Sequence, residues 1–216
     1  YLPQDFSIYR NMSVYGAMDY LGLLSGIPDK VRKDRIMALL EQVNLTENRK
    51  TKVRALSGGM KRRLGIAQAL LHEPRVLVVD EPTAGLDPEE RIRFRNLLSE
   101  FAEERIVLLS THIASDVEST CEKLGVLNEG RLIFNGSTEE LIQRAAGKVY
   151  LISATKRMDK QIKEKYCVLS INTSHSCTQY RVLSETKPEE NGTLENPTLE
   201  DGYMYLLSKM KGGACS

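Results

Sequence analysis

The stretch RVLVVDE, residues 75–81, decides the fold class of this chain. Its apolar, β-branched run lies between Pro74 and Pro82, which is typical of a strand buried on both faces of a sheet. A second buried run, Ile106–Ser110, follows a helical pattern from about Pro88 to Phe101. Strands separated by helices predict an α/β fold with a parallel sheet.

Further elements are expected on both sides of these strands. Apolar residues at helical spacing predict a surface helix over Val31–Val43, a second helix after Ser57 and a third around Ser115–Leu124. Two short apolar runs within Gly125–Phe134 predict a hairpin. The sequence STEE, residues 137–140, is a capping box, so a short helix is expected to start there.

The last third of the chain has a different sequence texture. Short strand-like runs at Val149–Ser153, Cys167–Ile171 and Tyr180–Leu183 alternate with polar segments. This pattern predicts a small C-terminal appendage of α+β character. The expected domains are residues 1–146 and residues 147–216.

The composition is that of an ordinary globular protein, with 216 residues, 41% hydrophobic residues, 27% charged residues and a net charge of +1. Such a chain is neither disordered nor a mini-protein. The even charge gives no general electrostatic reason to expect nucleic acid or an anionic membrane as the main partner. No apolar run approaches the roughly 18 residues that a membrane span requires.

The cysteines and the first residues indicate the setting of the chain. Cys121, Cys167, Cys177 and Cys215 form no C-x-x-C pair and have no histidine at metal-ligand spacing. We therefore expect a reducing cytoplasm and no structural zinc. The chain opens with Tyr1 in place of Met, and YLPQDF is typical of a strand end that runs into a loop. A truncated N-terminus is expected.

Asp80 and Glu81 are the strongest candidates for chemistry. They come at the carboxyl end of the predicted strand, where open α/β sheets bind ligands. Two adjacent carboxylates at this place require compensation, and Mg²⁺ is the natural one. One acid can help to hold the metal while the other orients or deprotonates a water beside a γ-phosphate. The alternative is that the pair only ends the strand and caps the next helix.

The sequence LSGGM, residues 56–60, precedes a predicted helix. It offers a hydroxyl group, two backbones without side chains and the positive end of a helix, which together make an anion site. The alternative is that Ser57 is only an N-cap and that Lys61, Arg62 and Arg63 form a solvated face. For an isolated S-G-G the alternative would be preferred.

His112 comes at the end of the second predicted strand, so it is expected at the same sheet edge as Asp80 and Glu81. A histidine there can hydrogen-bond a γ-phosphate, whereas an isolated one is more often a surface residue at a strand end. Between the two strands, AGLDP, residues 84–88, predicts a tight loop with Pro88 at a helix start.

With these motifs in this order, the sequence resembles the ATP-binding cassette (ABC) ATPases. LSGGM is similar to the ABC signature, VLVVDE (residues 76–81) to the Walker B strand, AGLDP to the D-loop and STH (residues 110–112) to the switch histidine. Gln4 in YLPQD resembles the Q-loop glutamine. The resemblance covers about residues 1–145. It implies a P-loop NTPase-like parallel sheet with a helical signature subdomain.

The resemblance also implies a role for each matched residue. Asp80 and Gln4 would help to coordinate Mg²⁺. Glu81 would activate the attacking water, and His112 would sense the γ-phosphate of the ATP held by the same chain. The residues that would close over the ATP held by a second subunit are Ser57, Gly58, Gly59, Met60 and Asp87.

Two features depart from the family pattern. The signature ends in Met60 in place of the common Gln, which removes a polar side chain but keeps the backbone donors. The sequence also has no G-x-x-x-x-G-K-[ST] phosphate loop, which lies upstream of the Q-loop in this family. The resemblance therefore implies an N-terminally truncated fragment that does not hydrolyse ATP by itself.

The surroundings of the motifs indicate a subfamily. Residues 1–28, residues 56–74 and the segment Pro197–Leu206 resemble the stand-alone ATPase subunits of bacterial multidrug, antibiotic-peptide or sodium exporters. From the residues alone, Pro197–Leu206 is interpreted as an N-capped amphipathic helix.

The leading hypothesis is an ATPase subunit of an ABC exporter, which binds two ATP molecules between two cassettes and drives a separate membrane permease. It would act as a homodimer in the cytoplasm, peripheral on the inner face of the membrane, with no nucleic acid partner. The region with Phe6, Tyr9, Tyr15 and Tyr20 would receive the cytoplasmic helices of the permease. The alternatives are a non-transport ABC protein that acts on ribosomes or DNA and an inactive truncated remnant.

Overall fold

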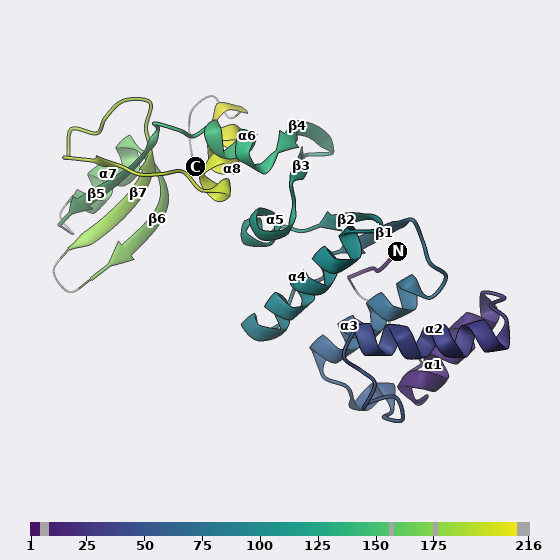
Figure 1. The fold of residues 1–216 in the computed structure, drawn as a ribbon. Coiled ribbons are helices and arrows are strands. Elements are labelled where there is room, and N and C mark those ends of the chain that lie inside the picture. Colours follow the sequence, from purple (N-terminus) through teal and green to yellow (C-terminus); the bar gives the residue numbers. More distant parts are fainter. Residues whose placement is uncertain (5–8, 156–157, 175–176, 211–216) are drawn as a thin grey trace. The chain divides into compact units, whose positions relative to one another are not determined.

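The chain forms two compact units, seen in a computed structural model that describes residues 1–4, 9–155, 158–174 and 177–210. The first unit is Tyr1–His112 and the second is Ile113–Ser216 (Figure 1). This division follows contacts within the chain. The domain boundary expected between residues 146 and 147 stays a prediction.

The first unit combines helices with a short parallel sheet, as the sequence predicts. Its elements in chain order are α1 (Val14–Leu24), α2 (Asp29–Gln42), a 3₁₀ turn (Val53–Ala55), α3 (Gly58–Leu70), β1 (Val76–Asp80), α4 (Pro88–Ala102) and β2 (Ile106–Ser110).

A buried arginine joins the first two helices. The Nε atom of Arg32 on α2 donates to Asp19 on α1 at 2.6 Å, and its Nη1 atom donates to the carbonyl oxygen of Ile27 at 2.8 Å. Only 7% of Arg32 is exposed. A buried guanidinium is tolerated because its donors find acceptors, so this ion pair fixes the turn between the helices.

The sheet of the first unit is parallel. β1 and β2 pair in register from Val76↔Ile106 to Asp80↔Ser110. On the other side of β1, the Leu2 N–H donates to the Val78 carbonyl oxygen at 2.8 Å. The α/β class with a parallel sheet is thus confirmed.

The prediction that both strands are buried on both faces is wrong. Leu77 and Val79 belong to the core formed with α3 and α4. On the opposite face Val76, Ile106 and Leu108 are 49%, 66% and 59% exposed. The reason is that no described element of the first unit packs on this second face.

The second unit consists of a hairpin, a four-stranded antiparallel sheet and four short helices among the described residues. Its elements are α5 (Ala114–Thr120), β3 (Lys123–Asn128), β4 (Arg131–Ser137), α6 (Thr138–Gln143), β5 (Val149–Ala154), α7 (Asp159–Lys165), β6 (Cys167–Thr173), β7 (Thr178–Leu183), β8 (Thr193–Leu194) and α8 (Leu199–Met210). The sheet has the order β6-β7-β5-β8. The α+β character expected for the C-terminal part is confirmed.

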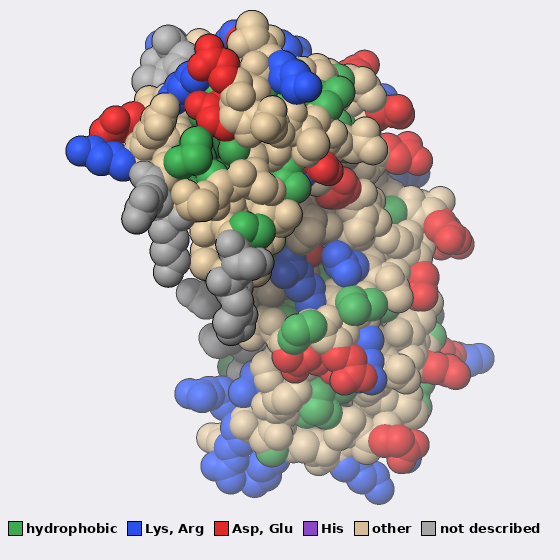
Figure 2. All heavy atoms as spheres, turned by 90° about the vertical axis from the view of Figure 1, so that its left-hand side faces the viewer, with side chains coloured by type: hydrophobic (Ala, Val, Ile, Leu, Met, Phe, Trp, Pro, Cys, Tyr) green, Lys and Arg blue, Asp and Glu red, His purple; other side chains and the backbone are tan. Residues whose placement is uncertain are grey.

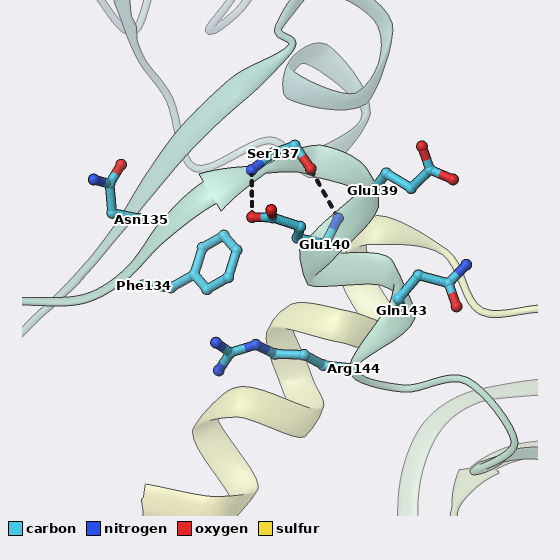
Figure 3. A pocket seen from close by; sticks show the side chains of 7 residues that line it. All are labelled: Phe134, Asn135, Ser137, Glu139, Glu140, Gln143 and Arg144. Atoms are coloured by element: carbon cyan, nitrogen blue, oxygen red, sulfur yellow. Dashed lines mark hydrogen bonds between the residues drawn. The ribbon is translucent and has the colours of Figure 1, made fainter.

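The predicted hairpin and capping box are both present. Glu129 and Gly130 join β3 to β4 with φ of 48° and 74°, the left-handed conformations of a tight hairpin turn. The Ser137 N–H donates to Glu140 Oε2 and the Glu140 N–H donates to Ser137 Oγ, each at 3.0 Å (Figure 3). The local residue pattern was sufficient for both predictions.

The helix predicted to extend to Leu124 is shorter than expected. α5 ends at Thr120, and Leu124 lies in β3 opposite Gly136. The ladder between β3 and β4 satisfies the backbone groups of this segment, so pairing with a distant strand overrides the helical spacing of its apolar residues.

α8 is the N-capped helix expected within Pro197–Leu206. The Asp201 N–H donates to the Thr198 hydroxyl oxygen at 3.3 Å, and the buried Asp201 carboxylate accepts from Arg181 Nη2 at 2.6 Å. A side chain at Gly202 would collide with the Leu141 carbonyl oxygen, since an added Cβ would lie 2.3 Å away. The close packing of α8 on α6 therefore requires glycine at this position.

No helix within the described residues is both long and apolar enough to cross a lipid bilayer. Figure 2 shows acidic and basic side chains spread over the visible face, in line with the even charge of the sequence.

A charged cluster around Tyr205 ties α8 to the rest of the second unit. Lys148 hydrogen-bonds the Tyr205 hydroxyl and lies 3.3 Å from Glu185 Oε2. Lys209 lies 2.5 Å from Glu185 Oε1, and the Tyr205 hydroxyl donates to the same oxygen at 3.1 Å. The hydrogen bond from Lys209 is the main cause that lowers the pKa of the Glu185 carboxyl to about 2.

This shift predicts a pH-dependent stability of the second unit. The pKa of Glu185 in the folded chain lies below its ordinary value of 4.5. The Glu185 carboxylate therefore adds its full contribution to the free energy of unfolding above pH 4.5, and this contribution is lost as the pH falls toward 2. Urea unfolding should show Glu185→Gln less stable than the parent chain at pH 6, with a gap that narrows as the pH falls toward 2.5. Glu118→Gln, at an exposed residue on α5, should show no such narrowing, and a gap that stays constant for Glu185→Gln would contradict the assignment.

Candidate functional site

The end of the parallel sheet brings two carboxylates beside the end of the next strand. Because Asp80 pairs in register with Ser110, the Ser110 hydroxyl reaches Asp80 Oδ1 and donates to it at 2.5 Å. The shared edge predicted for Asp80, Glu81 and His112 is therefore confirmed. The hydroxyl orients the Asp80 carboxylate, which is half-buried.

Glu81 has an unusual backbone and a divided carboxylate. Its φ is 44°, a left-handed conformation that is uncommon for a residue other than glycine, and its N–H donates to the Ser110 carbonyl oxygen at 2.9 Å. Its Oε1 atom lies 2.7 Å from His112 Nδ1. Its Oε2 atom is buried and has no hydrogen-bond partner among the described residues. A buried acceptor without a donor is costly and often marks a place for a water or ligand.

His112 is not simply a surface residue at the end of β2. Its imidazole is 74% exposed, yet its Nδ1 atom holds the Glu81 carboxylate. Exposure leaves the rest of the ring accessible to a ligand. The ring can therefore orient Glu81 through Nδ1 while its other side stays open to solvent.

The alternative that Asp80 and Glu81 cap the next helix is wrong. The N-cap of α4 is Asp87, whose Oδ1 atom accepts from the Glu90 N–H at 2.9 Å. Pro88 follows as the first residue of the helix, as predicted. The two acids at the end of β1 thus remain available for other contacts.

Ser57 is the N-cap of α3, so this part of the alternative holds. Its Oγ atom accepts from the Met60 N–H at 3.2 Å. The first turn of an α-helix has four amide donors without helical partners, and this bond uses one of them. Ser57 and Gly58 are exposed. The cap and an anion site are therefore compatible at this helix end.

The two signature glycines have different surroundings. A Cβ atom at Gly58 would meet nothing within 4 Å, whereas one at Gly59 would lie 2.4 Å from Glu90 Oε2. Glu90 is 3.4 Å from Arg63 Nε, and both side chains are largely buried. Gly59 therefore makes room for an ion pair between α3 and α4, and Gly58 leaves open space.

The interpretation of Lys61, Arg62 and Arg63 as a solvated face is wrong for the two arginines. Arg62 donates from Nη1 to the Gln4 carbonyl oxygen and from Nη2 to the Ala84 carbonyl oxygen, each at 3.2 Å. Arg63 donates to the Val43 carbonyl oxygen at 3.2 Å. Long side chains can bury their stems while their head groups find backbone acceptors.

The predicted site residues thus fall into two groups. Asp80, Glu81 and His112 meet at the sheet edge, while Ser57, Gly58, Gly59 and Met60 form the start of α3, with Asp87 at the start of α4. Gln4, which is exposed, is tied to the second group through its backbone. No role was predicted from the sequence for Ser110, Glu90 or Arg62. For Ser110, the signal was available in its position two residues before His112.

Comparisons with known proteins show which families and structures this chain is similar to. A family model described as ABC transporter matches residues 1–84. The chain is 34% identical over 171 residues to the uncharacterized ABC transporter ATP-binding protein YxlF of Bacillus subtilis (strain 168). The aligned region covers 79% of this chain and 58% of that protein. It is 40% identical over 147 residues to Nod factor export ATP-binding protein I of Ralstonia nicotianae, which covers 68% and 44%.

Among solved structures, cbiO1 from Clostridium perfringens, described as part of the ABC transporter complex cbiONQ, matches with a TM-score of 0.58 and 31% identity. The match covers 62% of this chain and 54% of that one. The chain spans about half the length of the curated relatives it matches.

The glycine environments predict unequal effects of alanine. Gly59→Ala should lower the free energy of unfolding by roughly 1 kcal/mol relative to Gly58→Ala, since the added methyl group displaces Glu90 from Arg63. Urea unfolding of the two variants measures the difference. In a Glu90→Ala background the difference should vanish; if it persists there, the collision with Glu90 is not its cause.

Proposed function

This chain belongs to the ABC transporter family, and we propose that its first unit supplies the catalytic edge and the signature of an ATP-hydrolysing subunit in an exporter. The contact between Glu81 and His112 beside Asp80 is the observation that carries the proposal. A general base, a residue that orients it and a metal-binding carboxylate at one sheet edge are the parts that phosphoryl transfer to water requires.

In this proposal Glu81 is the general base. His112 holds Oε1, and the carboxylate would accept a proton from a water once its Oε2 atom, buried in this structure, is opened to that water. The exposed remainder of the His112 ring contacts the γ-phosphate.

Asp80 and Gln4 would hold Mg²⁺, which neutralises phosphate charge when bound. The donor set fits this ion, because Mg²⁺ is usually bound through one or two oxygen ligands from the protein together with phosphates and waters. The Ser110 hydroxyl orients the Asp80 carboxylate. Among the described residues no group of three histidine, cysteine or acidic side chains could hold a metal ion.

The start of α3 would act on the ATP of a second subunit. Ser57 and Gly58 are exposed and the first turn of α3 keeps free amide donors, as a phosphate contact requires. Gly59, Met60 and Asp87 would take part at the same interface. We propose that the partner subunit is a second copy.

The proposed coupling to a transmembrane permease draws on relatives. Nod factor export ATP-binding protein I is named for export, and cbiO1 is part of a transporter complex. In this chain Tyr9 and Tyr20 form an edge-to-face pair with ring centroids 5.0 Å apart, and Tyr15 packs against the core. These rings would receive helices of a permease on the inner face of the membrane. Phe6, predicted to join them, lies outside the described residues.

The 216-residue chain alone should show no appreciable ATP hydrolysis, because its sequence lacks the phosphate loop and the lysine for the β- and γ-phosphates. Phosphate release by the purified chain at saturating ATP measures this. Turnover that disappears in Glu81→Gln would overturn the expectation.

Two variants test the division between the two ATP sites, in a homodimer that joins this chain to a phosphate loop. Glu81→Gln should slow hydrolysis by roughly 10² to 10⁴ while ATP still binds. Ser57→Arg should block closure of the dimer, since bulk and charge replace a small hydroxyl group at the helix end. The ATP affinity of the single subunit should barely change.

Mixing the two variants then separates the sites. One site of each mixed dimer carries both substitutions, and the other pairs an intact Glu81 with an intact signature. Partial recovery of hydrolysis is expected. No recovery, in a sample where mixed dimers are shown to form, would mean that the signature does not act across the dimer or that the two sites cannot work independently.

A further inference from the structure

We propose that Arg62 is a positioning residue that holds the Gln4 segment and the loop before α4 against the start of α3. This inference rests on the proposed function for its effect on hydrolysis. The contacts themselves belong to the structure of the first unit and involve no ligand.

The guanidinium of Arg62 bridges two segments that are 80 residues apart in the chain. Its Nη1 atom donates to the Gln4 carbonyl oxygen and its Nη2 atom to the Ala84 carbonyl oxygen, each at 3.2 Å. Arg62 itself is half-buried and lies two residues after Met60, in the second turn of α3. One planar group therefore connects three segments that carry proposed site residues.

Arg62 supplies a donor to both carbonyl groups. Of the backbone N–H groups in the described residues, none donates to the Gln4 or Ala84 carbonyl oxygen. Ala84 stands before Gly85, which has a φ of 72° and belongs to the turn between β1 and α4. Arg62 satisfies acceptors that the fold leaves open.

The neighbouring arginine anchors the same helix end on another side. Arg63 donates to the Val43 carbonyl oxygen after α2 and pairs with Glu90 on α4. Arg62 belongs to α3, so a shift of this helix end would move its guanidinium relative to the Gln4 and Ala84 carbonyl groups. A displacement of the signature is thus passed to Gln4, a proposed Mg²⁺ ligand, and to the loop that ends at Asp87.

Lysine cannot replace this arginine fully. A guanidinium presents separate nitrogens in a fixed plane, so it reaches two carbonyl oxygens with defined geometry, whereas an ammonium group offers one nitrogen. Arg62→Lys keeps the charge and loses the bridge. Arg62→Gln loses both, and Lys61→Gln changes the charge of the adjacent residue without touching the bridge.

Amide hydrogen exchange of the 216-residue chain, resolved by residue, tests the positioning directly. In Arg62→Lys and Arg62→Gln, the amides of Leu2, Ala84 and Leu86 should exchange roughly 3- to 10-fold faster. Each of these amides donates a backbone hydrogen bond in a segment that Arg62 holds, and that bond should open more often when the Arg62 contact is lost. The Val14 amide in α1 should be unchanged. Lys61→Gln should match the parent chain at every one of these amides. Unchanged exchange at Ala84 and Leu86 would overturn the proposal, and so would a uniform increase that includes Val14.

A kinetic measurement separates positioning from mere stability. In a cassette that joins this chain to a phosphate loop, Arg62→Lys should lower kcat by roughly 10-fold or more, while the ATP dissociation constant stays within about twofold, because Arg62 aligns groups without touching its own nucleotide. An equal loss in Lys61→Gln, or an unchanged kcat in Arg62→Lys, would overturn the proposal. Absence of hydrolysis by the parent cassette would instead count against the proposed function, since the exchange experiment uses no ATP.

Discussion

The parallel pairing of β1 with β2 is the interaction on which the candidate site depends. The register sets Asp80 opposite Ser110. Both strands end at the same edge of the sheet, where His112 Nδ1 lies 2.7 Å from Glu81 Oε1. Single backbone hydrogen bonds add little net stability. The register is fixed by Leu77 and Val79 on the covered face, because a slip of one residue would turn both toward solvent. The chemistry of the edge thus rests on two buried aliphatic side chains.

Sequence alone could predict those features that depend on a few neighbouring residues or on the order of strands and helices. Alternating strands and helices predicted that Asp80 and His112 share an edge, and the capping box at Ser137 needed only four residues. The burial of β2 and the end of α5 could not be predicted in this way. Exposure of Leu108 depends on whether anything covers the second face, and Leu124 became a strand residue because Gly136 pairs with it.

The roles of Arg62 and Gly59 were hidden for a different reason. The acceptors of Arg62 are backbone carbonyl groups, which every residue has and which therefore leave no mark in a sequence. Gly59 is required in part by Glu90, a side chain 31 positions later that approaches only after α3 and α4 have packed. A motif read as one unit for nucleotide binding therefore also holds its own subunit together. Gly58 has open surroundings, so packing within the subunit does not require glycine there and only the proposed contact with a nucleotide would.

The uncovered face of the parallel sheet has a consequence for the physical state of the chain. Val76, Ile106 and Leu108 are exposed there, and in the described residues β2 has a partner on one side only. An unpaired strand edge beside an apolar surface is a template for a further strand. One added strand can form hydrogen bonds with the free edge of β2, and a further layer of side chains can bury the exposed apolar face. In concentrated solution, copies of the chain can meet this demand for one another, so self-association would start at these two strands, and the even net charge would oppose it only weakly.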